Sequence, residues 1–118
     1  MSRIAVTGGT GKLGRAVVRD LAEHGHEVVV LDQVVPPGWN AGITRVDLTE
    51  YGQVVGALTG LDDRYDTVDA VVHLAARPSV PRSIEDPMAT HTVNATGTMQ
   101  VLEAVRRAEV PQIIVASS

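Results

Sequence analysis

Three glycines near the amino terminus carry the clearest chemical signal in the sequence, because they follow a G-x-G-x-x-G pattern. Glycines at this spacing allow a tight turn, a close approach of the backbone to a pyrophosphate, and close packing of a helix on a strand. Backbone N–H groups at the start of the next helix can then bind phosphate oxygens. A strand-like run precedes the pattern and a helix-like segment follows it. The sequence therefore predicts a dinucleotide-binding loop made by Gly8, Gly9, Thr10, Gly11, Lys12, Leu13 and Gly14.

An acidic residue at the end of the next strand-like run indicates which dinucleotide is bound. Asp32 follows Val28-Val29-Val30-Leu31, close to the ~20 residues after the loop at which a ribose-binding acid is expected. Its carboxylate would accept hydrogen bonds from a ribose 2′-OH and repel a 2′-phosphate, so NAD is favoured over NADP. Lys12 could approach a phosphate, but a solvated lysine explains it equally well. The alternative for the whole pattern is a glycine-rich turn with an unrelated surface aspartate.

The elements that must position this loop form an alternating pattern of strands and helices. Short apolar runs rich in β-branched residues, most of them apolar on both faces, are typical of buried parallel strands. Their alternation with helical segments predicts an α/β fold, a doubly wound parallel sheet of the Rossmann type with five strands in the order 3-2-1-4-5. The runs are Ile4 to Val6, Glu27 to Leu31, Ile43 to Val46, Val68 to Leu74, and Gln112 to Ala116.

Three segments have helical periodicity. The first has an apolar stripe and a stop at Gly25; the stripe comprises Leu13, Ala16, Val17 and Leu21. The second runs from Thr49 to Leu58. The third is long, with Asp86 placed as its cap, Pro87 at its first helical position, and periodicity as far as Val105.

Composition excludes several classes of function. The chain has 118 residues with no Cys, no Phe and a net charge of −4. The absence of Cys excludes disulfides and thiolate metal sites, and the histidines have no metal-ligand spacing, so no metal is expected. No basic block indicates a nucleic-acid partner. No apolar run approaches the ~18 residues of a membrane span, and no signal peptide is apparent. We therefore expect a single cytoplasmic domain, without membrane or nucleic-acid partners.

The loop from Thr7 to Gly14 has the T-G-x-x-G-x-x-G spacing of short-chain dehydrogenase/reductases. It resembles most the extended branch, the NAD-dependent epimerase/dehydratase family that acts on nucleotide sugars. Four further segments resemble motifs of that family in the same order along the chain. They are Asp47-Leu48, His73-Leu74-Ala75-Ala76, Asn94-Ala95-Thr96-Gly97-Thr98 and Ser117-Ser118. The resemblance therefore covers the chain from end to end.

The resemblance implies a role for each of these segments. Asp47 and Leu48 would lie against the adenine, although Asp47 could also cap the following helix. Residues after the fourth strand would lie beside the nicotinamide half, namely Leu74, Ala75, Ala76 and Arg77. Asn94 would bridge strand ends near the cofactor, since an asparagine inside a helix is unfavourable unless its amide is used. Ser117 would lie near the cofactor, and Ser118 would be the catalytic residue that orients a substrate hydroxyl. His73 is assigned no chemistry and is expected to hydrogen-bond to the backbone.

The family's catalytic base is missing from these 118 residues. It is a tyrosinate in a Tyr-x-x-x-Lys pair, with the lysine lowering the pKa of the tyrosine. Tyr51 and Tyr65 are the tyrosines here, and neither has a lysine four residues later because Lys12 is the one lysine. The resemblance thus implies that residues 1–118 are the NAD(P)-binding domain of a longer enzyme, truncated before its catalytic helix and inactive alone.

The resemblance leaves three functions open for the parent protein. It could be an epimerase or dehydratase that binds a nucleotide sugar and transfers a hydride through bound NAD. It could be a non-catalytic NAD(P) sensor of the atypical branch, which keeps the loop without the tyrosine. It could be a reductase of the same fold with a non-sugar substrate. The parent is expected to be a homodimer joined through the helix carrying Asn94, which would leave exposed apolar area on this chain.

Overall fold

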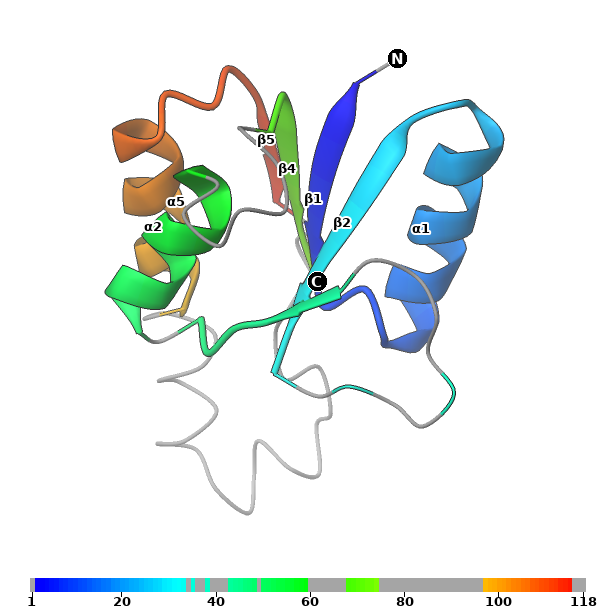
Figure 1. Cartoon of the computed structure of the whole chain (residues 1–118), viewed down its shortest axis with the longest axis horizontal. Helices are drawn as coiled ribbons and strands as arrows, with labels where there is room; N and C mark the ends of the chain where they lie inside the picture. The colour runs from blue at the N-terminus through cyan, green and yellow to red at the C-terminus, as the bar shows by residue number, and fades with distance from the viewer. Residues whose placement is uncertain are drawn as a thin grey trace.

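The structure is a computed structural model that describes residues 2–33, 35, 38, 43–48, 50–59, 68–74 and 97–115. Within these ranges one parallel sheet has the order β3-β2-β1-β4-β5, which confirms the predicted fold and strand order (Figure 1). Its strands are β1 (Arg3–Thr7), β2 (Glu27–Asp32), β3 (Ile43–Arg45), β4 (Ala70–His73) and β5 (Ile113–Val115). The helices are α1 (Lys12–Glu23), α2 (Tyr51–Thr59) and α5 (Gly97–Arg107).

The register of the central strands brings three polar residues to one edge of the sheet. Thr7, at the end of β1, is aligned with Leu31 of β2 on one side and with His73 of β4 on the other. Asp32 is the next residue of β2 and is aligned with Arg45 of β3. Because the strands are parallel, their carboxyl ends share this edge, which is where open α/β sheets bind ligands.

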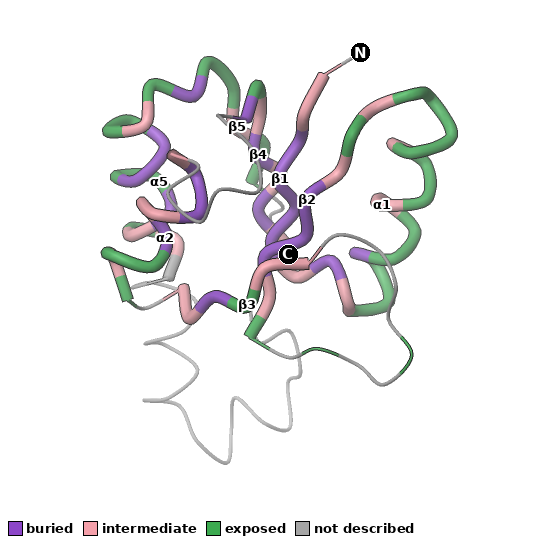
Figure 2. Tube along the Cα trace, viewed as in Figure 1, coloured by how far each residue is buried: buried purple, intermediate pink, exposed green. Residues whose placement is uncertain are grey.

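The helices cover the two faces of the sheet unequally. Figure 1 shows α1 on one side of the sheet and both α2 and α5 on the other. The main core lies on the α2 and α5 side, where it is built from aliphatic side chains and joins helix positions such as Val54, Leu58 and Val101 to strand positions such as Leu31 and Val71. Figure 2 shows the corresponding buried stretches along the central strands. The core therefore fixes the strands from which the loop emerges.

The apolar stripe predicted for α1 is wrong at two of its four positions. Leu13 is 61% exposed and Ala16 is exposed, whereas Val17 and Leu21 are half-buried. The helix instead turns Gly14 toward the sheet, where it is buried. Positions 14, 18 and 21 share a helical face, and Leu13 lies about 100° away from Gly14 on a helix of 3.6 residues per turn. Close contact at Gly14 thus decides which side of α1 is buried.

The helix ends that the structure describes lie at or within two residues of the ends that the sequence predicts. Gly25 has a φ of +84° and follows α1, so the predicted stop is confirmed. The second helix begins at Tyr51, two residues later than predicted. The third is described from Gly97, so the capping role of Asp86 and the position of Pro87 lie outside the described residues.

Two classes of site receive no support from the described ranges. No helix there has both the length and the apolar character that a bilayer span requires. Among the described residues, no three His, Cys, Asp or Glu side chains lie together in an arrangement that could hold a metal ion.

Candidate functional site

The glycine loop is a tight turn held by backbone hydrogen bonds at the end of β1. The Gly8 N–H donates to the carbonyl oxygen of Leu31 at 3.1 Å, which ties the loop to β2. The Gly11 N–H donates back to the Gly8 carbonyl oxygen at 3.2 Å. Gly8 has a φ of +72°, in the left-handed region that side chains rarely adopt. The turn therefore depends on a glycine at position 8.

The three glycines of the pattern face different surroundings. A Cβ on Gly14 would lie 2.1 Å from the Gly8 carbonyl oxygen, and one on Gly9 would lie 2.7 Å from Cγ1 of Val30. Both positions are thus needed for packing of α1 and the turn against the sheet. Among the described residues, a Cβ on Gly11 would meet only the Gly8 carbonyl oxygen, at 3.5 Å, which is an ordinary contact. Gly11 is also exposed. No described side chain therefore fills the space outside Gly11.

The amino terminus of α1 is built to receive an anion. Gly11 precedes the helix in extended conformation and has no side chain with which to cap it. The first turn contains no acidic residue. The positive end of the helix dipole thus has neither a capping side chain of Gly11 nor a first-turn acid as a partner, the two side-chain partners that usually compensate it. A phosphate group placed beside Gly11 would supply them, so the observed backbone fits the pyrophosphate of a dinucleotide.

The side chain of Asp32 is hydrogen-bonded to this loop at Thr10. The hydroxyl of Thr10 donates to Oδ2 of Asp32 at 2.7 Å, and the Thr10 N–H approaches the same oxygen at 3.3 Å. On the other side of the loop, Nε of Arg15 donates to the carbonyl oxygen of Thr10 at 2.8 Å. Asp32 and Thr10 are both half-buried. The sequence placed Asp32 and Thr10 in one site but held no sign of the contact between their side chains.

A second set of polar contacts joins the ends of β1, β4 and α5. The hydroxyl of Thr7 and Nδ1 of His73 share a hydrogen bond of 2.8 Å, and Nε2 of His73 and the hydroxyl of Thr98 share one of 3.0 Å. The N–H of Leu74 donates to the Thr7 hydroxyl oxygen at 2.9 Å. Thr7 is fully buried and His73 is 3% exposed. The expectation that His73 bonds to the backbone is wrong for these two ring contacts, because each ring nitrogen bonds to a threonine hydroxyl.

Burial lowers the pKa of His73 below its ordinary value of about 6.5. In the unfolded chain this histidine takes up a proton as the pH falls through that ordinary value, while in the folded chain it stays neutral to lower pH. The unfolded state then binds more protons, so this contribution to stability is complete above about pH 6.5 and is lost as the pH falls toward the folded pKa.

We expect the free energy of unfolding to decrease between pH 7.5 and pH 5, and the decrease to be smaller in His73→Asn. Chemical denaturation at a series of pH values measures both slopes. An unchanged slope in His73→Asn would contradict the prediction.

Asp47 and Leu48, for which the resemblance predicts contact with an adenine, lie between β3 and α2. The Asp47 N–H donates to the side-chain oxygen Oε1 of Gln53 at 2.9 Å, and the Asp47 carbonyl oxygen accepts from the Glu50 N–H at 3.0 Å. Leu48 is half-buried and packs against the core. These contacts fix the segment at the start of α2. The remaining candidate residues lie outside the described residues, namely Ala75, Ala76, Arg77, Asn94, Ser117 and Ser118.

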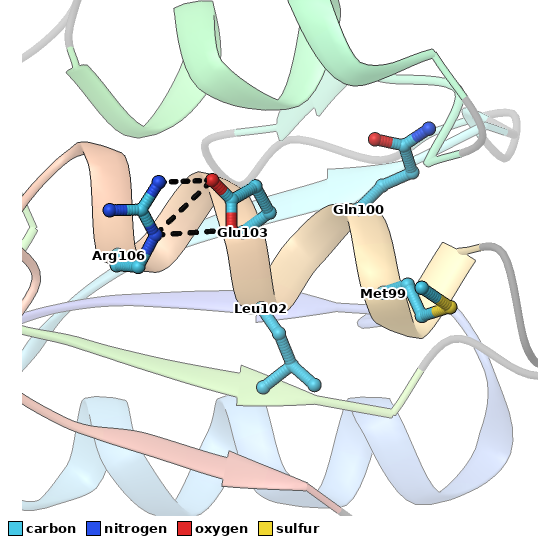
Figure 3. A pocket seen from close by; sticks show the side chains of 5 residues that line it. All are labelled: Met99, Gln100, Leu102, Glu103 and Arg106. Atoms are coloured by element: carbon cyan, nitrogen blue, oxygen red, sulfur yellow. Dashed lines mark hydrogen bonds and ion pairs between the residues drawn. The ribbon is translucent and has the colours of Figure 1, made fainter.

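A separate surface occurs on the outer side of α5. Met99 is 70% exposed and Leu102 is 44% exposed, and both line a shallow hollow with Gln100, Glu103 and Arg106 (Figure 3). The guanidinium of Arg106 forms an ion pair with Glu103, and this contact lowers the pKa of the Glu103 carboxyl. Apolar side chains exposed together with a charged pair are typical of a protein contact surface. This surface is on α5, across the sheet from α1 (Figure 1).

Known proteins resemble this chain over nearly all of its length. The model of the NAD dependent epimerase/dehydratase family matches residues 4–118. The UDP-glucose 4-epimerase of Neisseria meningitidis serogroup C is 33% identical over 127 residues, an alignment that covers 100% of this chain and 37% of that protein. The chain therefore spans little more than a third of the length of such a relative.

Solved structures give the same result. The UDP-glucose 4-epimerase of Thermus thermophilus, in complex with NAD, has 37% identity and a TM-score of 0.83, covering 98% of this chain and 37% of the other. The UDP-glucose 4-epimerase of Thermotoga maritima, with UDP-glucose, has 28% identity and a TM-score of 0.85, covering 98% of this chain and 38% of the other. The fold of the described residues is thus shared with these enzymes.

Proposed function

The chain belongs to the NAD-dependent epimerase/dehydratase family, and from this premise we propose that it is the NAD-binding part of a nucleotide-sugar epimerase or dehydratase. The observation that carries the proposal is the glycine turn, in which no described side chain fills the space beside Gly11 and the Asp32 carboxylate is hydrogen-bonded to Thr10. A pyrophosphate and a ribose are the two parts of a dinucleotide that such neighbours would bind.

Each part of NAD has proposed contacts on the chain. The backbone from Thr10 to Leu13 would donate hydrogen bonds to the pyrophosphate, and Asp32 would accept them from the adenosine ribose. Asp47 and Leu48 would lie along the adenine. We assign the nicotinamide side to Leu74, Ala75, Ala76 and Arg77, with Asn94 and Ser117 near it, although all of these except Leu74 lie outside the described residues.

The proposed substrate is a nucleotide sugar, because relatives that match this chain are UDP-glucose 4-epimerases and one of them was solved with UDP-glucose. Bound NAD would supply the chemistry by accepting a hydride from a sugar carbon and returning it. In this chain Ser118 would orient the substrate hydroxyl. The 118 residues contain no Tyr-x-x-x-Lys pair, and we propose that they bind NAD without catalysing epimerisation by themselves.

Two other functions predict different results. A non-catalytic sensor would bind the dinucleotide at the same turn, and a reductase of the same fold would act on a non-sugar substrate. An assay of the full-length protein with UDP-glucose separates both from an epimerase, because only the epimerase would convert this sugar.

The homodimer is also a proposal. It rests on the exposed Met99 and Leu102 of α5, and sedimentation velocity tests it.

Calorimetric titration of the purified chain with NAD, and in parallel with NADP, tests the proposed site. We expect NAD to bind more tightly than NADP, because the Asp32 carboxylate accepts from a 2′-OH and repels a 2′-phosphate. Gly11→Ala sharpens the test, since its Cβ fits the protein but occupies the space proposed for the pyrophosphate. Its thermal midpoint should stay within about 4 °C of the wild type, corresponding to a change below about 1 kcal/mol, while its NAD affinity falls at least about tenfold.

Either of two results would reject the proposal. One is a folded wild-type chain, checked by circular dichroism, that binds neither dinucleotide in this short form nor as the full-length protein. The other is a Gly11→Ala variant with wild-type stability and wild-type NAD affinity, which would show that the nucleotide does not approach the turn at this point.

A further inference from the structure

We infer that Thr10 sets the preference for NAD over NADP by holding the Asp32 carboxylate in place, an inference that rests on the proposed NAD site. Thr10 is a positioning residue in this account, because it acts on the nucleotide through Asp32. The glycine pattern places Thr10 in the dinucleotide-binding loop, where backbone N–H groups are expected to bind the phosphates and the Thr10 side chain has no assigned role.

The first support is the geometry at Oδ2 of Asp32. This one oxygen lies 2.7 Å from the Thr10 hydroxyl and 3.3 Å from the Thr10 N–H. Two donors from one residue restrict both the position and the rotation of the carboxylate. Hydrogen bonds to an ionised acceptor are stronger than those between neutral groups. The contact also joins the end of β2 to the loop after β1, and thus spans 22 residues of sequence.

The second support is that Thr10 is itself held from the opposite side. Nε of Arg15, one turn into α1, donates to the Thr10 carbonyl oxygen at 2.8 Å. The Arg15 N–H donates to the carbonyl oxygen of Gly11, at 2.8 Å, so the base of this side chain is fixed by the helix. The backbone of Thr10 therefore has a support on α1 while its side chain holds Asp32. A hydroxyl on a mobile loop could not position the acid in this way.

The third support is the charge around Asp32. Arg45 is aligned with Asp32 on the neighbouring strand, and its Nε donates to the carbonyl oxygen of Gln33 at 3.2 Å. Lys12 and Arg15 are exposed at the start of α1. Arg45 beside Asp32 and Arg15 beside Thr10 would attract a 2′-phosphate if the Asp32 carboxylate could rotate away. A carboxylate that is held in place keeps its negative charge where the 2′-phosphate would bind and its acceptor oxygens where a 2′-OH would bind.

The competing explanation is that the Thr10 side chain only helps the loop to fold. That role would lower the affinities for NAD and NADP by the same factor, and it would persist after the carboxylate is removed. A positioning role lowers the ratio of the two affinities and disappears when Asp32 is absent. A double-mutant cycle therefore separates the two explanations.

The experiment compares four variants with the wild-type chain: Thr10→Val, Thr10→Ser, Asp32→Ala and the double variant Thr10→Val with Asp32→Ala. Calorimetry measures the NAD and NADP affinities of each, and thermal unfolding checks that each is folded. We expect Thr10→Val to lower the ratio of NAD affinity to NADP affinity about tenfold, as for loss of one hydrogen bond to a charged group. Thr10→Ser keeps the hydroxyl and should stay within about twofold of wild type. Thr10→Val should not change the ratio further in the Asp32→Ala background.

Three outcomes overturn the inference. In the first, Thr10→Val leaves the ratio of the two affinities unchanged, whether or not both affinities fall. In the second, it lowers the ratio as much without Asp32 as with it. In the third, the wild type binds neither dinucleotide, in this short form or as the full-length protein, which would remove the proposed NAD site as well. In the first two outcomes, a wild-type chain that prefers NAD would reject the role of Thr10 and leave the NAD site standing.

Discussion

Gly14→Ala is expected to lower the free energy of unfolding by about 3 kcal/mol or more, the range of severe steric and cavity defects in protein cores. The added Cβ would lie 2.1 Å from the Gly8 carbonyl oxygen and 2.7 Å from the Gly9 Cα. Both obstacles are backbone atoms, so no side-chain rotation relieves the contact. The Gly8 carbonyl also accepts from the Gly11 N–H, and the Gly8 N–H is bonded to β2. Moving the loop away would therefore break the turn.

Thermal and urea unfolding measure this loss. A change of 1 kcal/mol shifts the midpoint of a domain of this size by roughly 4 to 8 °C, so Gly14→Ala should unfold well over ten degrees below the wild type. The matched control is Gly52→Ala on α2, where a Cβ meets no atom of the described residues within 4 Å. Alanine is the better helix former there and should raise stability by about 0.5–1 kcal/mol. Equal stability of the two variants would show that α1 does not pack against the turn as described.

Asp32→Ala is expected to lower NAD affinity by about tenfold to a hundredfold and to raise NADP affinity. Each hydrogen bond to a charged group contributes about 1.5–3 kcal/mol, and a tenfold change corresponds to about 1.4 kcal/mol. The NADP gain follows because removing the negative charge leaves Arg45, aligned with position 32, and Arg15, bonded to Thr10, as the cations on the neighbouring elements. Competition calorimetry with both dinucleotides measures the two affinities.

Asp20→Ala is the control for net charge. Asp20 is an exposed acid near the carboxyl end of α1, where its Oδ1 lies 3.7 Å from Nδ1 of His24. Its removal changes the net charge by the same amount but should leave both affinities within about twofold of wild type, because exposed charges beyond about 10 Å are largely screened. If Asp20→Ala altered the preference as much as Asp32→Ala, overall charge would explain the result and the local contact would not.

The sequence predicted the features that depend on local pattern. Short β-branched runs indicated the strands because residues buried on both faces must be apolar along their whole length. The order 3-2-1-4-5 followed from the alternation of strands and helices together with right-handed crossovers. The glycine spacing and the position of Asp32 after β2 indicated the candidate site because the strand, turn and helix that carry them are consecutive in the chain.

Local pattern failed where burial depends on the neighbouring element. Leu13 has the periodicity of a core residue, yet it is 61% exposed because the contact of Gly14 with Gly8 and Gly9 sets the rotation of α1. The glycine spacing predicted three roles, namely a tight turn, approach of a pyrophosphate, and packing of a helix on a strand. The packed structure shows that added Cβ atoms would clash at Gly9 and Gly14, whereas at Gly11 a Cβ would meet no described side chain.

Side-chain pairs between distant segments were decided by the tertiary structure alone. The hydroxyl of Thr7 meets His73 across 66 residues of sequence, and His73 meets Thr98 across 25. The hydroxyl of Thr10 meets Asp32 across 22. Thr7 and His73 meet because β1 and β4 are aligned and end at one edge of the sheet, while the start of α5 brings Thr98, and the loop after β1 brings Thr10, to the same edge. The sequence by itself thus determined the fold and the residues of the candidate site, and the register of the sheet decided which of them hold one another.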